Sequence, residues 1–138
     1  MNEEITKESF ILKSEKAEIS SIENLISQYN KIAEIPEEKI INFQIAVSEA
    51  LVNAIVHGNE EDKNKKVFVT LECKKNFLKI SVKDQGKGFD CNIIPDPTKE
   101  ENLFKEHGRG IHIMRTLVDE FNCNSDSNGT EFVLTVRK

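Results

Sequence analysis

The sequence is short of the residues and runs that mark several classes of protein. It has three cysteines in 138 residues, an odd number with no CxxC pair, so neither a disulfide framework nor a zinc knuckle is evident. A reducing cytoplasm is therefore the expected location. No apolar run approaches the length of a membrane span, about 18 residues, and the acidic Asn2-Glu3-Glu4 start is unlike a secretory signal. The sequence thus predicts a cytoplasmic protein with no membrane contact.

Basic charge is also in deficit. Lys and Arg number 19 against 24 Asp and Glu, so the net charge is −5 and the positive excess that general nucleic-acid binding needs is missing. The composition is that of a globular protein, with 38% hydrophobic and 31% charged residues. The length suits one domain, and no repeat, low-complexity segment or linker divides it. We therefore expect a single domain over residues 1–138.

Hydrophobic periodicity predicts both helices and strands. The expected helices are 17–32, capped by Ser14, then 36–58, and one that starts near 111. The expected strands are 10–12, 66–72, 77–83 and a final hairpin that turns near 128–129. Hairpins with helices on one face predict an α+β fold, a two-layer α/β sandwich with a mixed, mostly antiparallel sheet. The stretch 89–107 is a loop of a length that is usually functional or mobile.

The second expected helix carries polar side chains in line. From 45 to 56 it is apolar nearly all round, which predicts burial, and burying a lone carboxylate is costly unless it is paired or faces a polar cavity. Glu49, Asn53 and His57 follow one another at i, i+4 and i+8, which places them on one face. This pattern favours a polar site along the helix. The alternative is a helix edge at the surface, where His57 complements the helix dipole.

A second group of residues, Asp84-Gln85-Gly86-Lys87-Gly88, leaves the strand over 77–83. An Asp at this position can accept a hydrogen bond from an amino group such as N6 of adenine, and the glycines let the backbone approach a flat ring closely. An ordinary turn is the alternative, since Asp-x-Gly also marks turns. Gly129-Thr130 opens the last strand, where the Thr130 hydroxyl could reach the same ring edge or simply belong to a hairpin turn.

Two glycines flank an arginine at the start of the last expected helix, in Gly108-Arg109-Gly110. Backbone N–H groups at a helix N-terminus attract anions, and Arg109 can add a charge-assisted bond to a phosphate. Two common nucleotide motifs are missing: there is no GxxxxGK[ST] P-loop, and Gly86-x-Gly88 lacks the third glycine of a dinucleotide fingerprint. A bound nucleotide would therefore need another design.

In their order and spacing, these motifs resemble those of the GHKL ATPases, the superfamily of gyrase, the ninety-kilodalton heat-shock chaperones, histidine kinases and mismatch-repair ATPases. The motifs are Glu49-x-x-x-Asn53-x-x-x-His57, Asp84-x-Gly86-x-Gly88, Gly108-x-Gly110 and Gly129-Thr130. Within that superfamily, the phrases AVSEALVNA over 46–54 and GFD over 88–90 are similar to the anti-sigma-factor serine kinases. The resemblance covers residues 10–138 and implies the ATP-binding fold called the Bergerat fold.

The resemblance implies a role for each of these positions. Glu49 would be the general base, Asn53 would ligate Mg²⁺ through its amide oxygen, and Asp84 would bind the adenine amino group. The other motif residues would contact the nucleotide: His57, Gly86, Gly88, Gly108, Arg109, Gly110 and Thr130. Residues 89–107 would form the ATP lid.

The resemblance also implies a function and its partners. The expected protein is an ATP- and Mg²⁺-dependent serine/threonine kinase that phosphorylates an anti-sigma-factor antagonist, sequesters a sigma factor and can form a homodimer. The stretch 108–114 departs from the glycine-rich form of the well-defined kinases and is more like related bacterial regulators. A noncatalytic ATP-binding switch is therefore an alternative. The catalytic domain of a histidine kinase is a weaker alternative, because the first expected helix, 17–32, has no histidine.

Overall fold

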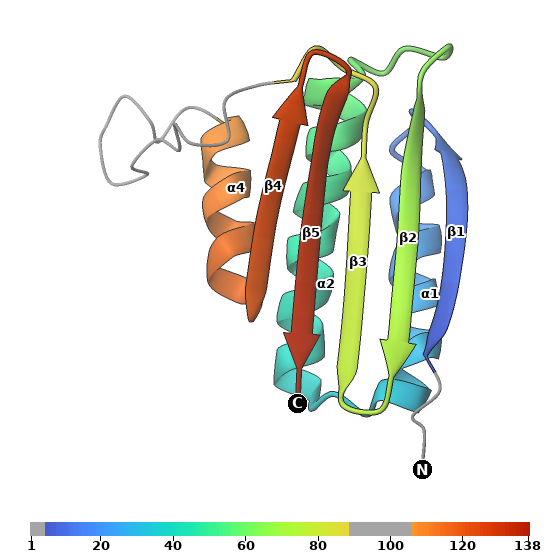
Figure 1. Cartoon of the computed structure of the whole chain (residues 1–138), viewed down its shortest axis with the longest axis vertical. Helices are drawn as coiled ribbons and strands as arrows, with labels where there is room; N and C mark the ends of the chain where they lie inside the picture. Colours follow the sequence, from blue (N-terminus) through green and yellow to red (C-terminus); the bar gives the residue numbers. More distant parts are fainter. Residues whose placement is uncertain (1–4, 89–105) are drawn as a thin grey trace.

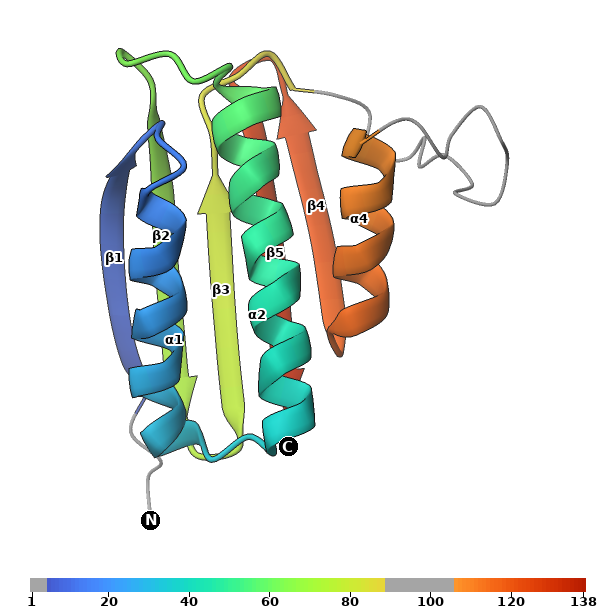
Figure 2. The same cartoon turned by 180° about the vertical axis from the view of Figure 1, so that it is seen from behind.

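The computed structural model describes residues 5–88 and 106–138 as a layer of helices on one face of a five-stranded sheet (Figure 1). The strands are β1 (Thr6–Lys13), β2 (Lys66–Lys74), β3 (Phe77–Lys83), β4 (Glu120–Asp126) and β5 (Gly129–Arg137). The helices are α1 (Glu18–Ala33), α2 (Glu37–Val52), the π-helix η1 (Asn53–Gly58) that continues α2, and α4 (Glu106–Leu117). Figure 2 shows the helices from the side of the sheet that they cover.

The sheet has the strand order β1-β2-β3-β5-β4, and every pairing between these described strands is antiparallel. The predicted α+β, two-layer architecture is confirmed, but the sheet is not mixed. The reason lies between β1 and β2, where α1 and α2 run in opposite directions along the sheet (Figure 2). A single helix between two strands brings the second strand back parallel to the first. Here two helices of opposite direction lie between the strands, so β2 runs antiparallel to β1.

Two local predictions about the helices need correction. Ser14 does not cap α1, whose N-cap position is Ala17 without a side-chain hydrogen bond. The Ser14 hydroxyl donates instead to the carbonyl of Lys65 at 2.6 Å. The second helical run does reach Gly58, as predicted, but its last six residues are π-helical. Wider π turns are frequent at functional sites, and this one carries two of the predicted site residues.

The core lies between the inner face of the sheet and the helix layer. Alternate residues of β2 and β3 are buried there, as their alternation predicts: Val67, Val69, Leu71, Cys73, Leu78, Ile80 and Val82. The buried residues of α2 are Ile40, Phe43, Ala46, Val47, Ala50 and Leu51. Helix α2 lies over the middle of the sheet, and its continuation η1 carries the buried polar side chain of Asn53.

The run Glu37–Gly58 has the length and mean hydropathy of a membrane span, although polar residues interrupt it and it holds no long uninterrupted apolar run. By length and composition its 22 residues could cross a membrane, the one such helix in the part of the chain that the structure describes. Half of its most apolar stretch is buried inside the structure. A helix at the centre of a sandwich is apolar because it packs against the sheet, so length and composition alone do not separate it from a membrane helix.

The cysteines differ in their environments. Cys73 is free and buried in the core, where burial raises the pKa of its thiol. The thiol donates a weak hydrogen bond to the carbonyl of Tyr29 at 3.4 Å. Cys123 on β4 is disulfide-bonded, which the spacing of the cysteines in the sequence did not indicate.

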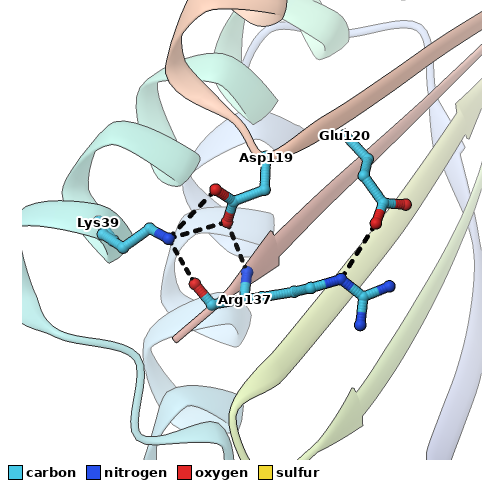
Figure 3. A network of polar contacts seen from close by, with 4 residues as sticks. All are labelled: Lys39, Asp119, Glu120 and Arg137. Carbon is cyan, nitrogen blue, oxygen red and sulfur yellow. Dashed lines mark hydrogen bonds and ion pairs between the residues drawn. The ribbon is translucent and has the colours of Figure 1, made fainter.

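A group of charged residues joins the first turn of α2 to the last residues of β5 (Figure 3). Lys39 Nζ lies 3.0 Å from Asp119 Oδ2 and donates to the carbonyl of Arg137 at 2.6 Å. The Arg137 N–H donates to Asp119 Oδ2 at 2.7 Å, and Arg137 Nε lies 3.0 Å from Glu120 Oε1. Burial opposes the charge of Asp119, but the contacts with Arg137 and Lys39 outweigh it and hold the pKa of that carboxyl below its usual value.

Candidate nucleotide-binding site

A cavity of about 400 Å³ lies at the end of the sheet where β3 ends and β5 begins, which is the upper end in Figure 1. It is lined by Asn53, His57, Gly58, Glu60, Lys65, Asp84, Lys87, Gly88, Thr130 and Phe132. Five of the predicted site residues are in this set: Asn53, His57, Asp84, Gly88 and Thr130. The fold therefore brings three motifs that are distant in sequence to one cavity.

Asp84 is the buried acid of the cavity, with 2% of its surface exposed. Its Oδ1 accepts hydrogen bonds from the N–H groups of Gly86 at 2.9 Å and Thr130 at 3.1 Å. Burial raises the pKa of the carboxyl, and the two backbone bonds and the charge of Lys65 only partly offset it. No hydrogen bond to Oδ2 occurs within residues 5–88 and 106–138. The carboxylate is thus fixed in orientation by one oxygen and can offer the other to a ligand.

Glycines surround this carboxylate because side chains would not fit. A Cβ on Gly58 would overlap the Asp84 carboxylate itself. A Cβ on Gly129 would overlap the Asp84 carbonyl, and the φ of +142° there also favours glycine. Gly86 lies against the Gly58 carbonyl in the same way. Gly58, predicted only as the last residue of the helix over 36–58, therefore has a steric role at the cavity.

Asn53 is the buried amide of the cavity, 3% exposed. Its Nδ2 donates to the carbonyl of Glu49 at 3.0 Å, whereas its Oδ1 is buried with no hydrogen-bond partner among the described residues. An amide oxygen is a ligand that hard Mg²⁺ takes, together with waters and phosphate oxygens. The described residues hold no group of three or more His, Cys, Asp and Glu that could bind a metal by themselves. The buried Asn53 oxygen can therefore supply one ligand to a Mg²⁺ ion.

Helix α4 packs against Glu49 and Asn53. A Cβ on Gly110 would lie 2.8 Å from Asn53 Nδ2 and 3.0 Å from Glu49 Oε2, so the missing side chain lets α4 come close. The expected start of this helix near 111 is wrong, since α4 begins at Glu106 and Gly108-Arg109-Gly110 lies within it. The side chain of Arg109 and the loop residues 89–105 lie outside what the structure describes.

The prediction missed five residues of the cavity lining: Gly58, Glu60, Lys65, Lys87 and Phe132. Lys65 and Glu60 belong to a charged loop without a motif, and Lys87 stands inside a motif identified by its glycines. Phe132 alternates with the apolar residues of β5 and was indistinguishable from core. Its place two residues after Thr130, on the same face of the strand, is the signal that could have found it.

Residues 12–136 match the family model of the histidine kinase-like ATPase domain. The chain therefore belongs to this family, which agrees with the two-layer fold and with the resemblance to the GHKL ATPases. Among curated proteins, the serine-protein kinase RsbW of Bacillus subtilis is 32% identical over 99 residues, 67% of this chain and 62% of that protein. An anti-sigma F factor of Clostridium perfringens is 32% identical over 101 residues, 70% of this chain and 71% of that protein.

A further relative, the anti-sigma F factor of Shouchella clausii, is 34% identical over 64% of this chain and 62% of its own length. The chain thus matches less than two thirds of the length of two of these three relatives. Among solved structures, the RsbU and RsbW domains of a Mycobacterium tuberculosis protein give a TM-score of 0.67 at 19% identity, over 96% of this chain and 32% of that chain. The histidine kinase domain of a blue-light activated kinase from Erythrobacter litoralis gives a TM-score of 0.58 at 22% identity, over 88% of this chain and 60% of that chain. At these identities the structures show a shared fold.

Proposed function

We propose that the chain binds ATP with Mg²⁺ in this cavity, phosphorylates an anti-sigma-factor antagonist on serine or threonine, and sequesters a sigma factor. The observation that carries the proposal is the meeting of two buried groups at one cavity. One is the Asp84 carboxylate, fixed by two backbone N–H groups, and the other is the Asn53 amide oxygen, which has no hydrogen-bond partner in the described residues. Membership of an ATPase family and relatives named serine-protein kinase and anti-sigma F factor support it.

The adenine ring of ATP would bind at the Asp84 end of the cavity. Asp84 Oδ2 would accept a hydrogen bond from the adenine amino group, and the glycines around it would let the ring approach. Thr130 and the apolar ring of Phe132 line the same cavity. Guanine carries a carbonyl oxygen where adenine carries the amino group, so it would set an acceptor against the carboxylate. We therefore expect the protein to prefer ATP to GTP.

The phosphates would lie toward Asn53 and α4. Asn53 Oδ1 would ligate Mg²⁺, which when bound neutralises phosphate charge, and His57 lines the cavity one turn further along η1. Gly108, Arg109 and Gly110 on α4 would hold phosphate oxygens, with the lid over 89–107 closing beside them. Gly86 and Gly88 would shape the adjoining pocket wall.

Glu49 would act as the general base. Its carboxylate lies beside Gly110 and Asn53, close to the proposed metal ligand. There it would take the proton from a serine or threonine hydroxyl of the antagonist as that oxygen attacks the γ-phosphorus and ADP leaves. Phosphoryl transfer of this kind depends mainly on positioning and charge neutralisation, which these residues would supply. The homodimer and the absence of nucleic-acid and membrane partners stay predictions.

The departure of 108–114 from the well-defined kinases favours one second candidate, a noncatalytic ATP-binding switch. The test is to incubate the purified protein with Mg²⁺, γ-labelled ATP and candidate antagonists from neighbouring genes. Label on a serine or threonine of the antagonist supports the kinase, whereas ATP binding without label supports the switch. Acid-labile label on a histidine would point to a histidine kinase, and no nucleotide binding would overturn the proposal.

A further inference from the structure

Asn59 is a fully buried polar residue directly behind the cavity wall, and its side chain uses both amide hydrogens and its oxygen. Its Nδ2 donates to Ser14 Oγ and to the carbonyl of Lys66, each at 2.9 Å. Its Oδ1 accepts the N–H of Gln85 at 2.7 Å. One side chain thus joins the segment after β1, the start of β2 and the segment after β3.

Asn59 and its partners Gln85 and Lys66 are chain neighbours of residues that line the cavity. Asn59 follows Gly58, and Gln85 follows Asp84. The bond between Asn59 Oδ1 and the Gln85 N–H therefore fixes the distance between Gly58 and Asp84. That distance matters because these two residues are in contact with no room to spare. A shift of either would turn the carboxylate.

Capping of η1 does not account for this side chain. The helix-end bond at this position is made by the Asn59 backbone N–H, which donates to the carbonyl of Ala54 at 2.8 Å. All three side-chain bonds instead go to other segments of the chain. A buried amide with every polar atom satisfied specifies one arrangement of the segments that it joins.

We propose that Asn59 is a positioning residue for nucleobase recognition, which aims the Asp84 carboxylate by holding the Asp84–Gly86 turn against Gly58. This inference rests on the proposed nucleotide site. Without the bond from Gln85 to Asn59, the turn can move and the acceptor for the adenine amino group loses its alignment. Guanine makes no such bond, so its affinity depends less on Asn59. Asn59 thus governs the preference between the two bases.

The test compares Mg-ADP and Mg-GDP binding by calorimetry in wild type, Asn59→Ala and Ser14→Ala, at a temperature where each is folded. Asn59→Ala should weaken ADP binding about tenfold and GDP binding little, because one aligned hydrogen bond is lost. Ser14→Ala is the matched control: it removes a buried partner of Asn59 but leaves the bond to Gln85, so it should lower the melting temperature and keep the preference. If Asn59 only stabilised the fold, its replacement would lower the folded fraction, and with it the apparent affinity, by the same factor for both nucleotides.

An unchanged preference for ADP over GDP in folded Asn59→Ala overturns the inference while leaving the proposed function intact. Wild type that binds neither nucleotide overturns the proposed function itself. Should Asn59→Ala not fold, hydrogen exchange in wild type decides. At equal saturation ADP should slow exchange of the Gln85 amide more than GDP does, whereas the Arg137 amide at the far end responds equally to both. Equal slowing at Gln85 counts against the inference.

Discussion

The Cα of Gly58 lies against the carboxylate of Asp84, with no space between them for even a methyl group. The two residues come from different elements, the end of η1 and the segment after β3, and they meet at the wall of the cavity. Their contact ties the end of the long central helix to the acid that we expect to select the base. Replacing Gly58 even by alanine should therefore disturb the cavity.

We expect Gly58→Ala to weaken ATP binding about tenfold or more and to lower the free energy of unfolding by about 1–3 kcal/mol, the usual cost of overpacking. Calorimetry and urea denaturation measure the two effects. The double variant Gly58→Ala/Asp84→Ala is the control, because removing the carboxylate relieves the overlap. It should be about as stable as Asp84→Ala alone. Additive losses of stability would show that the contact is not the cause.

We expect Asp84→Asn to stabilise the nucleotide-free protein at neutral pH. Burial raises the pKa of Asp84 above its ordinary value of 3.8, so the folded state disfavours the charge, and the stability contribution of this group falls as pH rises through the raised pKa. The amide keeps an oxygen for the N–H groups of Gly86 and Thr130. The gap in melting temperature between variant and wild type should therefore open from acid to neutral pH. A gap that does not depend on pH would contradict this account.

The same substitution should weaken ATP binding by about tenfold or more, because it sets an amide donor against the adenine amino group. An amide donor suits the carbonyl of guanine, so the preference should shift toward GTP. Parallel calorimetry with both nucleotides measures the shift. Equal losses for ATP and GTP would mean that Asp84 does not contact the base.

The sequence predicted the class of fold because hairpin alternation and helical periodicity are local signals. It also predicted Asp84, from the Asp-x-Gly-x-Gly motif where the chain leaves a strand, and Asn53, since a polar side chain in an apolar run is conspicuous. It did not show that η1 is a π-helix, because the hydrophobic spacing of a sequence does not separate a widened turn from an α-helical one. The role of Asn59 was equally hidden: its partners Ser14 and Gln85 are distant in sequence, and only the folded chain brings them together.

We expect Glu49→Gln to slow phosphate transfer to the antagonist by about 100-fold or more, the usual scale for loss of a general base, and to change ATP affinity by less than a few-fold. The amide keeps the shape of the side chain but cannot accept the proton. Glu23→Gln is the matched control, since Glu23 on α1 accepts a hydrogen bond from Ser48 at 2.7 Å, away from the cavity lining. Its transfer rate should stay near that of wild type. Wild-type turnover by Glu49→Gln would exclude Glu49 as the base.

The last prediction concerns the charged group at the far end of the sheet. The pKa of Asp119 is lowered despite burial, because the Arg137 N–H and the Lys39 ammonium favour its charge. Its stabilising contribution is therefore complete above the ordinary pKa of 3.8 and is lost as pH falls through the lowered value.

Asp119→Asn should lower the free energy of unfolding by about 0.5–1 kcal/mol at neutral pH, the size of a partly exposed ion pair, and by less as the pH becomes strongly acidic. Urea denaturation at several pH values measures the difference. Glu120→Gln is the control, because Glu120 meets Arg137 only through an exposed pair and should change stability little. Neither variant should alter ATP affinity, since the cavity lies at the opposite end of β5. A stability difference that persists unchanged into strong acid would show that packing of Asp119, rather than its charge, joins α2 to the end of the sheet.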